Sequence, residues 1–367
     1  MGSRQAAKRR TRPGNGPSAG APVQIDLALQ GGGSHGAFTW GVLDRLLQDE
    51  ALEISGISGT SAGAMNAVAL AAGLVEGGRE GARASLARFW DAVGRASPFH
   101  SVLDTPWMEP WLAESNPWMV LARAQAEWMG RFLSPYQLNP LNVNPLRQIL
   151  DATIDFDSVR ACRKVQLFIA ATHVRTGRLR LFRQSEMTAD MVLASACLPL
   201  LFQAVEVGGD AYWDGGYAGN PSLLPLIVES PGDDLVLVQI NPSLREGVPT
   251  TARDIMDRTS EITFNASLLK EMRNIGLLKR LIQEEGGPGH QRYSHSVLQR
   301  IDRLRLHRIE AEAQTSALGA SSKMNTRPSF LARLHDIGVE AADAWLARNG
   351  RRLGRESTID VVGEFAP

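Results

Sequence analysis

Cysteine is almost absent from this chain of 367 residues, which holds only Cys162 and Cys197. Two such residues give neither a disulfide framework nor the paired spacing of a metal site, so we expect no metal. Hydrophobic residues make up 44% of the chain and charged residues 21%, a composition that can form a sizeable core without cross-links. Low cysteine content is compatible with a reducing compartment, and we expect a cytoplasmic protein.

Net charge and long apolar runs are also lacking. The 39 Lys and Arg residues balance 39 Asp and Glu residues, so no overall field attracts nucleic acid or anionic membrane. We therefore expect no nucleic-acid partner. No stretch approaches the roughly 20 uninterrupted apolar residues of a membrane span, which predicts a soluble or peripheral membrane protein. The sequence carries no signal of oligomeric state.

The segment 1–22 is basic and rich in Gly, Pro, Ser and Ala. It lacks the apolar run of a secretory signal. Such a composition buries too little apolar surface to offset the entropy of ordering, so we interpret the segment as a disordered tail. A second hypothesis makes it an electrostatic tether to anionic lipid head groups.

The ordered chain is expected to begin with a strand at 23–29, which stops at a run of three glycines. Residues 34–47 carry apolar side chains at helical spacing, and 52–57 have the pattern of a second strand. A tight turn and an alanine-rich helix at 64–73 follow. The order strand, loop, helix, strand, turn, helix is typical of a parallel sheet with right-handed crossovers.

The rest of the chain divides by composition. Residues 89–156 hold most of the tryptophans and many prolines, which indicates an insertion that serves either as a lipid-facing lid or as ordinary packing on the sheet. Residues 165–182 and 203–213 predict hairpins. The apolar run 235–240 predicts a buried strand, and 242–367 a mainly helical extension.

The pentapeptide at 59–63 has the pattern G-x-S-x-G around Ser61, with Gly59 and Gly63 at its ends. A nucleophilic serine on a strained turn between strand and helix needs small neighbours, because the surrounding backbones approach closely. The N-terminus of the following helix also favours developing negative charge. Alone, the same pattern also occurs as a glycine turn with an incidental serine.

A second glycine motif, G-x-G-x-x-G, runs from Gly31 to Gly36. A dinucleotide site would need an acidic residue at the end of the second strand, and that strand ends in the serine turn instead. We therefore expect no nucleotide or other cofactor. The better interpretation is an oxyanion hole formed by backbone N–H groups of Gly31, Gly32, Gly33 and Ser34. Because the two motifs follow consecutive strands, we expect them side by side at one sheet edge.

Asp214 stands before Gly215 and Gly216 at the end of an apolar and aromatic stretch, where its carboxylate could enter a cleft. An aspartate in a hairpin turn is the alternative. No histidine has a convincing motif around it. Four histidines follow Asp214 and are expected to be solvated surface residues: His290, His295, His307 and His335.

These three motifs, in this order, resemble the patatin-like phospholipase family, over roughly residues 23–241. The resemblance implies a three-layer α/β/α sandwich with a mainly parallel sheet. It also implies a Ser–Asp dyad without histidine, in which Ser61 is the nucleophile, Asp214 the base, and Gly32 and Gly33 the oxyanion donors.

One position departs from the family, which commonly has Arg or Lys where this chain has His35. A neutral or partly charged imidazole puts a preference for anionic head groups in doubt, while ester hydrolysis is unaffected. The predicted function is lipid acyl hydrolysis, with a lipid or ester as the partner and contact with a membrane surface as a further hypothesis. The alternatives are an esterase or thioesterase for other substrates, and a lipid-binding scaffold.

Overall fold

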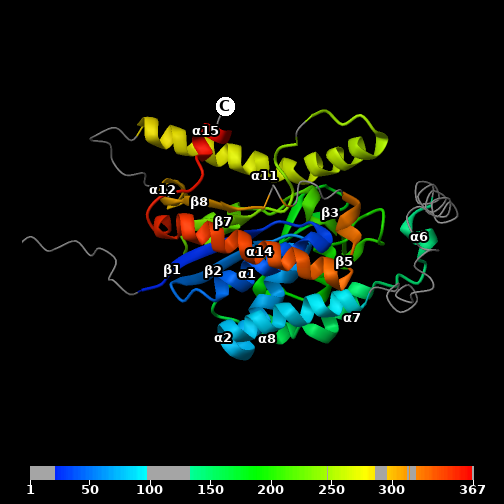
Figure 1. Ribbon diagram of the computed structural model, residues 1–367. Helices are drawn as coiled ribbons and strands as arrows, with labels where there is room; N and C mark the ends of the chain where they lie inside the picture. The colour runs from blue at the N-terminus through cyan, green and yellow to red at the C-terminus, as the bar shows by residue number, and fades with distance from the viewer. Residues whose placement is uncertain are drawn as a thin grey trace, which may run out of the picture.

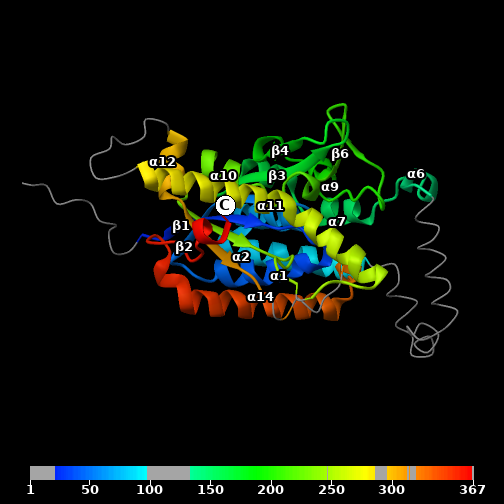
Figure 2. The same cartoon turned by 90° about the horizontal axis from the view of Figure 1, so that it is seen from above.

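The computed structural model describes residues 21–96, 133–245, 247–285, 296–311, 314 and 320–365. A mixed sheet of mostly parallel strands lies between two layers of helices, which is an α/β sandwich (Figures 1 and 2). Three sequence predictions lie wholly or mostly outside the described residues: those for the basic tail, for the centre of the Trp/Pro-rich insertion, and for His290 and His295.

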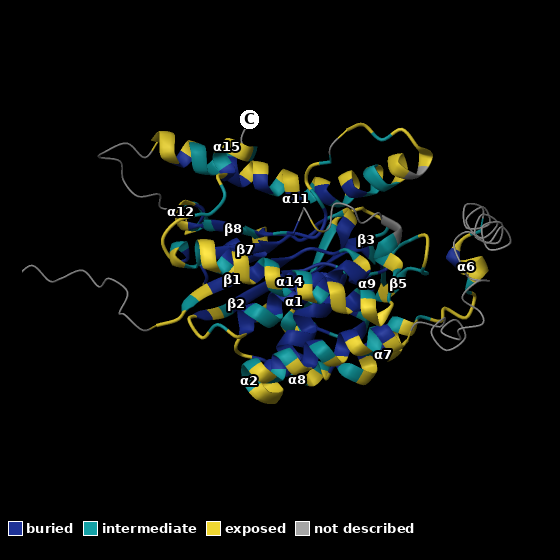
Figure 3. Ribbon diagram, viewed as in Figure 1, coloured by how far each residue is buried: buried dark blue, intermediate teal, exposed yellow. Residues whose placement is uncertain are grey.

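The sheet is built around strands that are buried along almost their whole length (Figure 3). Its order is β5-β6-β3-β2-β1-β7-β8, with β4 paired to β3. Five strands run parallel to one another: β3, β2, β1, β7 and β8. β4 and β6 pair antiparallel with β3, and β5 pairs antiparallel with β6. The strands are β1 (Val23–Leu29), β2 (Leu52–Gly59), β3 (Gln166–His173), β4 (Leu179–Arg183), β5 (Val205–Val207), β6 (Asp210–Asp214), β7 (Asp234–Val238) and β8 (Arg305–Ile309).

Helices cover both faces, because alternate strand residues point to opposite sides and most are apolar on each side. The larger core lies under α1 (Gly36–Leu47), α2 (Ala62–Arg95), α7 (Pro145–Thr153), α8 (Phe156–Ala161), α9 (Ala189–Ser195) and α14 (Pro328–Asn349). The smaller core lies under α10 (Leu224–Glu229), α11 (Ala252–Glu285), α12 (Ser296–Arg303) and α15 (Val361–Phe365). α6 (Pro135–Leu138) lies beside the sandwich (Figure 1).

The C-terminal region contributes to the sheet as well as to the helices. Strand β8 pairs in parallel with β7, and α14 packs along α1. His307 lies on β8 and is fully buried, so the expectation of a solvated histidine there is wrong. The arginines around it indicated a surface segment, but the segment is a strand in which Leu306, His307 and Ile309 are buried. Among the described residues, no helix combines the length and apolar character that crossing a bilayer requires.

Candidate functional site

Ser61 occupies a strained turn between β2 and α2. Its backbone has φ 54° and ψ −120°, in the region that residues with a side chain rarely adopt. The conformation is held from both sides: the Ser61 N–H donates to Ser195 Oγ at 2.9 Å, and the following residues enter α2. A strained serine at the start of a helix therefore stands clear of the sheet, with its hydroxyl at the carboxyl end of β2.

The first glycine of the loop after β1 lies directly against this serine. A Cβ on Gly31 would come within 2.8 Å of both Ser61 Cβ and the carbonyl oxygen of Thr60, so only glycine allows the approach. The N–H of Gly31 donates to Asn220 Oδ1 at 2.7 Å. The N–H group that the motif offered as an oxyanion donor is therefore already hydrogen-bonded to Asn220 in this structure.

Gly32, Gly33 and Ser34 continue the loop along the cavity that holds Ser61. Gly33 has φ +58°, which favours glycine, and residues 33–35 form the short helix η1 (Gly33–His35). Among the described residues, the N–H groups of Gly32 and Gly33 meet no hydrogen-bond acceptor. They are available to a negative charge that develops next to Ser61.

The sheet register brings Asp214 to Ser61. Gly59 at the end of β2 pairs with Ile169 of β3, and two residues further along β3, Ala171 pairs with Asp214. The backbone of Asp214 is fixed at both ends, because its N–H donates to the Cys197 carbonyl at 2.8 Å and its carbonyl accepts from Thr172 Oγ1 at 2.8 Å. β6 therefore delivers the carboxylate where β2 has ended.

The environment of Asp214 raises its affinity for a proton. The residue is 1% exposed, and burial raises the pKa of its carboxyl to about 7. Three influences oppose that rise in pKa: a 2.7 Å hydrogen bond from the Gly216 N–H, the nearby hydroxyl of Ser61, and the charge of Lys323. A carboxylate with a pKa near neutrality can take the hydroxyl proton of Ser61 far better than an ordinary one.

The other glycines of the three motifs stand where two pieces of backbone or a ring come too close for a side chain. The clearest case is Gly63, on which a Cβ would lie 2.2 Å from the Leu29 carbonyl oxygen. These positions let α2 and the turn after β6 pack tightly on the strands. The set comprises Gly36, Gly59, Gly63, Gly215 and Gly216.

A cavity of about 500 Å³ opens over Ser61 and Asp214. Apolar side chains of α2, among them Phe89 and Trp90, form one wall together with the segment 196–202. Among the residues that the structure describes, the lining contains one carboxylate, Asp214, and one cation, Lys323 of the short helix η4 (Ala320–Met324). The volume and the apolar wall suit an acyl chain next to the serine.

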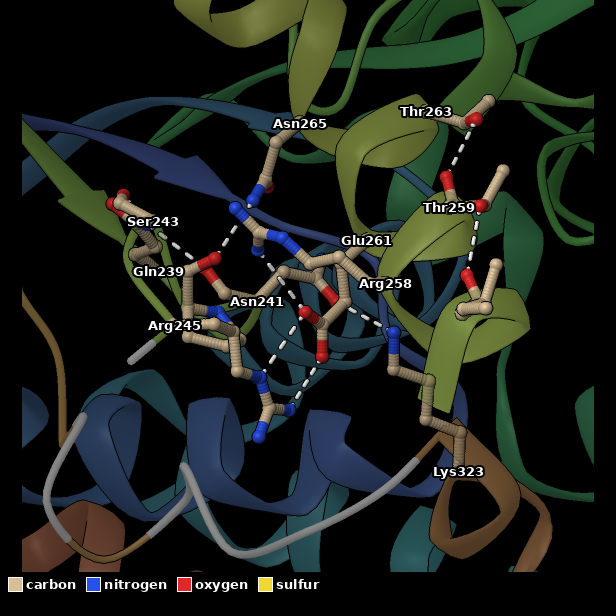
Figure 4. A network of polar contacts seen from close by, with 12 residues as sticks. Gln239, Asn241, Ser243, Arg245, Arg258, Thr259, Glu261, Thr263, Asn265 and Lys323 are labelled. Carbon is tan, nitrogen blue, oxygen red and sulfur yellow. Dashed lines mark hydrogen bonds and ion pairs between the residues drawn. The ribbon is translucent and has the colours of Figure 1, made fainter. Parts of the chain in front are cut away.

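Several polar residues that support the glycine loop were missed by the sequence analysis. The Gly31 carbonyl accepts from Asn241 Nδ2 at 3.1 Å, and Asn241 Oδ1 accepts from Lys323 Nζ at 2.6 Å (Figure 4). Asn220 holds the other side of Gly31. Asn241 follows β7 at the carboxyl edge of the sheet, a position that could have identified it. Lys323 had no such signal.

His35 is buried beneath the loop instead of facing the cavity. Its Nε2 lies 2.7 Å from Ser322 Oγ, and burial, with a smaller effect from the charge of Lys323, lowers the pKa of the imidazole to about 4. The ring is therefore neutral at pH 7. Residue 35 therefore carries no positive charge at pH 7, in contrast to the Arg or Lys expected at this position.

Within the described part of the chain, no three His, Cys, Asp or Glu residues are grouped so as to hold a metal ion. Of the expected lid, Trp90 lies in α2 and donates its Nε1–H to Asn66 Oδ1 at 2.9 Å. The other tryptophans of the insertion lie outside the described residues.

A family model described as patatin-like phospholipase matches residues 27–227, more than half of the chain. No curated protein matches. Among solved structures, VipD from Legionella pneumophila is 16% identical with a TM-score of 0.38, over 89% of this chain and 67% of that one. ExoU of Pseudomonas aeruginosa, crystallised with SpcU, is 13% identical with a TM-score of 0.28, over 94% and 76%.

Proposed function

Starting from the fact that this chain belongs to the patatin-like phospholipase family, we propose that it hydrolyses acyl esters of lipids through Ser61 and Asp214. The observation that carries the proposal is that both residues line the same cavity. The Ser61 hydroxyl is near enough to the buried carboxylate of Asp214 to lower its pKa, and the N–H groups of Gly32 and Gly33 belong to the same lining.

In the proposed reaction, Asp214 accepts the hydroxyl proton as Ser61 Oγ forms a bond to the ester carbonyl carbon. The carbonyl oxygen becomes an oxyanion, which the N–H groups of Gly32 and Gly33 stabilise. Asp214 then gives its proton to the departing alcohol as the ester C–O bond breaks, which leaves an acyl-enzyme. Water, deprotonated by the same carboxylate, releases the fatty acid and restores Ser61.

We further propose that the substrate is met at a lipid surface. Three apolar side chains that line the cavity are also strongly exposed: Leu200 at 79%, Met324 at 60% and Leu201 at 44%. Exposed apolar groups around a cavity are favoured where they enter a lipid layer. Activity should therefore rise when a short-chain ester passes its critical micelle concentration, and equal rates on both sides would contradict this part.

The nucleophile is tested by labelling with a fluorophosphonate, which reacts with activated serines. The wild-type protein should be labelled, and Ser61→Ala should not. Ser260→Ala is the matched control, because Ser260 lines the same cavity and takes no part in the proposed reaction. Labelling that survives Ser61→Ala, or that is lost only in Ser260→Ala, would refute the assignment.

Product analysis by mass spectrometry tests the substrate class. Incubation with phospholipids, lysophospholipids and neutral glycerides should release free fatty acid in the wild type and none in Ser61→Ala. Release from short, water-soluble esters or thioesters alone would instead favour an esterase for other substrates. Lipid binding without release of any acid would favour a scaffold.

A further inference from the structure

The described lining of the cavity over Ser61 has two chemically different sides. α2, α7 and the segment 196–202 contribute an apolar wall, in which the one polar side-chain group, the Trp90 N–H, is already bound to Asn66. A second side comes from α11 and the chain around η4, which contact each other. Besides the apolar Phe264 and Met324, it carries Ser260, Lys323 and Thr326.

Lys323 is held firmly on this second side. Its own carbonyl oxygen lies so near Gly33 that a Cβ there would be 2.4 Å away, which places η4 against the glycine loop. Its ammonium donates to Asn241 Oδ1, a neutral acceptor. An ammonium has three hydrogens, so a single bond to an amide leaves donors for a ligand in the cavity.

Two carboxylates of α11, Glu261 and Asp257, attract the charge of Lys323. Glu261 also forms ion pairs with both Arg245 and Arg258 (Figure 4), so its charge is shared among three cations. Asp214 also attracts it, but burial keeps that carboxyl easily protonated. A cation that is partly withdrawn from water is stabilised by an anion beside it. The site is thus suited to a substrate that brings a negative charge to this second side of the cavity.

We propose that Lys323 binds the phosphate of a glycerophospholipid while the acyl chain lies along α2 and the segment 196–202. In such a lipid, a single glycerol unit joins the phosphate to the ester, which matches a cation beside the glycine loop and an apolar wall in the same cavity. Lys323 thus supplies, from the C-terminal region, the positive charge that is absent at His35. This inference deepens the proposed function and rests on it.

The test compares two monomeric substrates with the same acyl chains, dihexanoyl phosphatidylglycerol and dihexanoylglycerol, below their micelle concentrations. For Lys323→Met, the ratio of kcat/KM for phospholipid to that for diglyceride should fall about 10- to 100-fold, the value of a charge-assisted hydrogen bond. Most of the loss should appear in KM. Lys323→Arg should keep the ratio within a few-fold of wild type.

Arg327→Met is the matched control, because Arg327 is an exposed cation in the same segment and does not line the cavity. Its ratio should equal that of wild type. An unchanged ratio in folded Lys323→Met, or an equal fall in Arg327→Met, would overturn the inference. If Lys323→Met does not fold, competition decides: glycerol 3-phosphate should inhibit wild-type hydrolysis of dihexanoylglycerol competitively, and absence of inhibition at millimolar concentration would overturn it.

Binding separates this inference from the proposed function. In Ser61→Ala, calorimetry with dihexanoyl phosphatidylglycerol should show an affinity that falls about tenfold or more when Lys323→Met is added. If wild type hydrolyses no ester, the proposed function fails while this measurement still tests Lys323. If esters are hydrolysed and the affinity is unaffected by Lys323→Met, only the further inference fails.

Discussion

Asp214 and Asp234 are both 1% exposed, but they lie at opposite ends of the sheet in opposite electrostatic settings. Asp214 ends β6 beside Ser61, and burial raises its pKa to about 7. Asp234 begins β7, where the hydrogen bonds of His307 and Arg305 overcome the effect of burial and hold its pKa below the usual value. Burial alone therefore does not raise the pKa of a carboxyl: the charged partners of Asp234 separate it from Asp214, the base that we propose.

The comparison also shows why an Asp–His pair is weak support for a triad. His307 Nε2 lies 3.0 Å from Asp234 Oδ1, and its Nδ1 lies 3.2 Å from Thr358 Oγ1. The pair sits where β7 begins, whereas Ser61 sits beyond the end of β2, a strand parallel to β1 and β7. In this fold the pair fastens the C-terminal segment to the sheet.

The largest expected effect is on catalysis. Asp214→Asn should lower kcat by about a thousandfold or more, because an amide cannot take the proton of Ser61. Steady-state hydrolysis of a chromogenic ester checks this, with circular dichroism to confirm the fold. Asp234→Asn is the matched control and should keep most of its kcat at a temperature where it remains folded. Comparable losses of kcat in both variants would contradict the proposal that Asp214, and not Asp234, is the base.

For stability we expect the reverse: Asp234→Asn should be the more damaging substitution. Asp234→Asn should lower the free energy of unfolding by about 3 kcal/mol, because it removes one partner of a buried charge cluster. Asp214→Asn should be at least as stable as wild type at pH 8, because the amide needs no desolvation of a charge. Urea unfolding at pH 8 measures both. A destabilised Asp214→Asn beside an unaffected Asp234→Asn would contradict the assignment of roles.

The pH dependence follows from the two directions of shift. The pKa of Asp214 is raised in the folded state, so its ionisation reduces stability as pH rises from about 4 to 7. Asp234 has a lowered pKa, so its contribution is present above about pH 4 and is lost as pH falls below it. The free energy of unfolding of each Asn variant is compared with that of wild type from pH 3 to 8. The difference should change between about pH 4 and 7 for Asp214→Asn, and below about pH 4 for Asp234→Asn.

Activity should depend on pH through Asp214 alone. Because its ionised form acts as the base, kcat/KM should fall about tenfold per pH unit below an apparent pKa of about 7. Lys323→Met should move this limb to higher pH, since the charge of Lys323 lowers the pKa of Asp214. A limb near pH 4 in the wild type would mean that another group serves as the base.

The smallest effect is expected at the exposed rim. Leu200→Ser should reduce hydrolysis of micellar substrate a few-fold and leave hydrolysis of the monomeric ester nearly unchanged, because Leu200 is 79% exposed and far better suited to lipid than to water. Val248→Ser, an equally exposed apolar position outside the cavity lining, is the control. Equal losses on both substrates would place Leu200 in substrate binding instead of surface contact.

Much of the candidate site could be predicted from the sequence, because each of its motifs spans only a few consecutive residues. The turn at Ser61 and the glycine loop each need small residues within a few positions, and consecutive parallel strands must end at the same edge. Prediction failed for His307, which stands among arginines that indicate a surface. β8 is a strand of the sheet, and Leu306, His307 and Ile309 are all buried. Gly31 fits the oxyanion motif, but its N–H is bound by Asn220.

The sequence by itself determined the three motifs, their order and the resemblance that they carry, since each depends on backbone conformations that neighbouring residues set. Only the tertiary structure decided the charge of the site. In the folded chain Asp214 is buried, His35 is buried with a lowered pKa that leaves its ring neutral, and Lys323 lines the cavity. The physical reason is that desolvation and Coulomb interactions depend on distance in space, and Lys323 is far from the motifs along the chain.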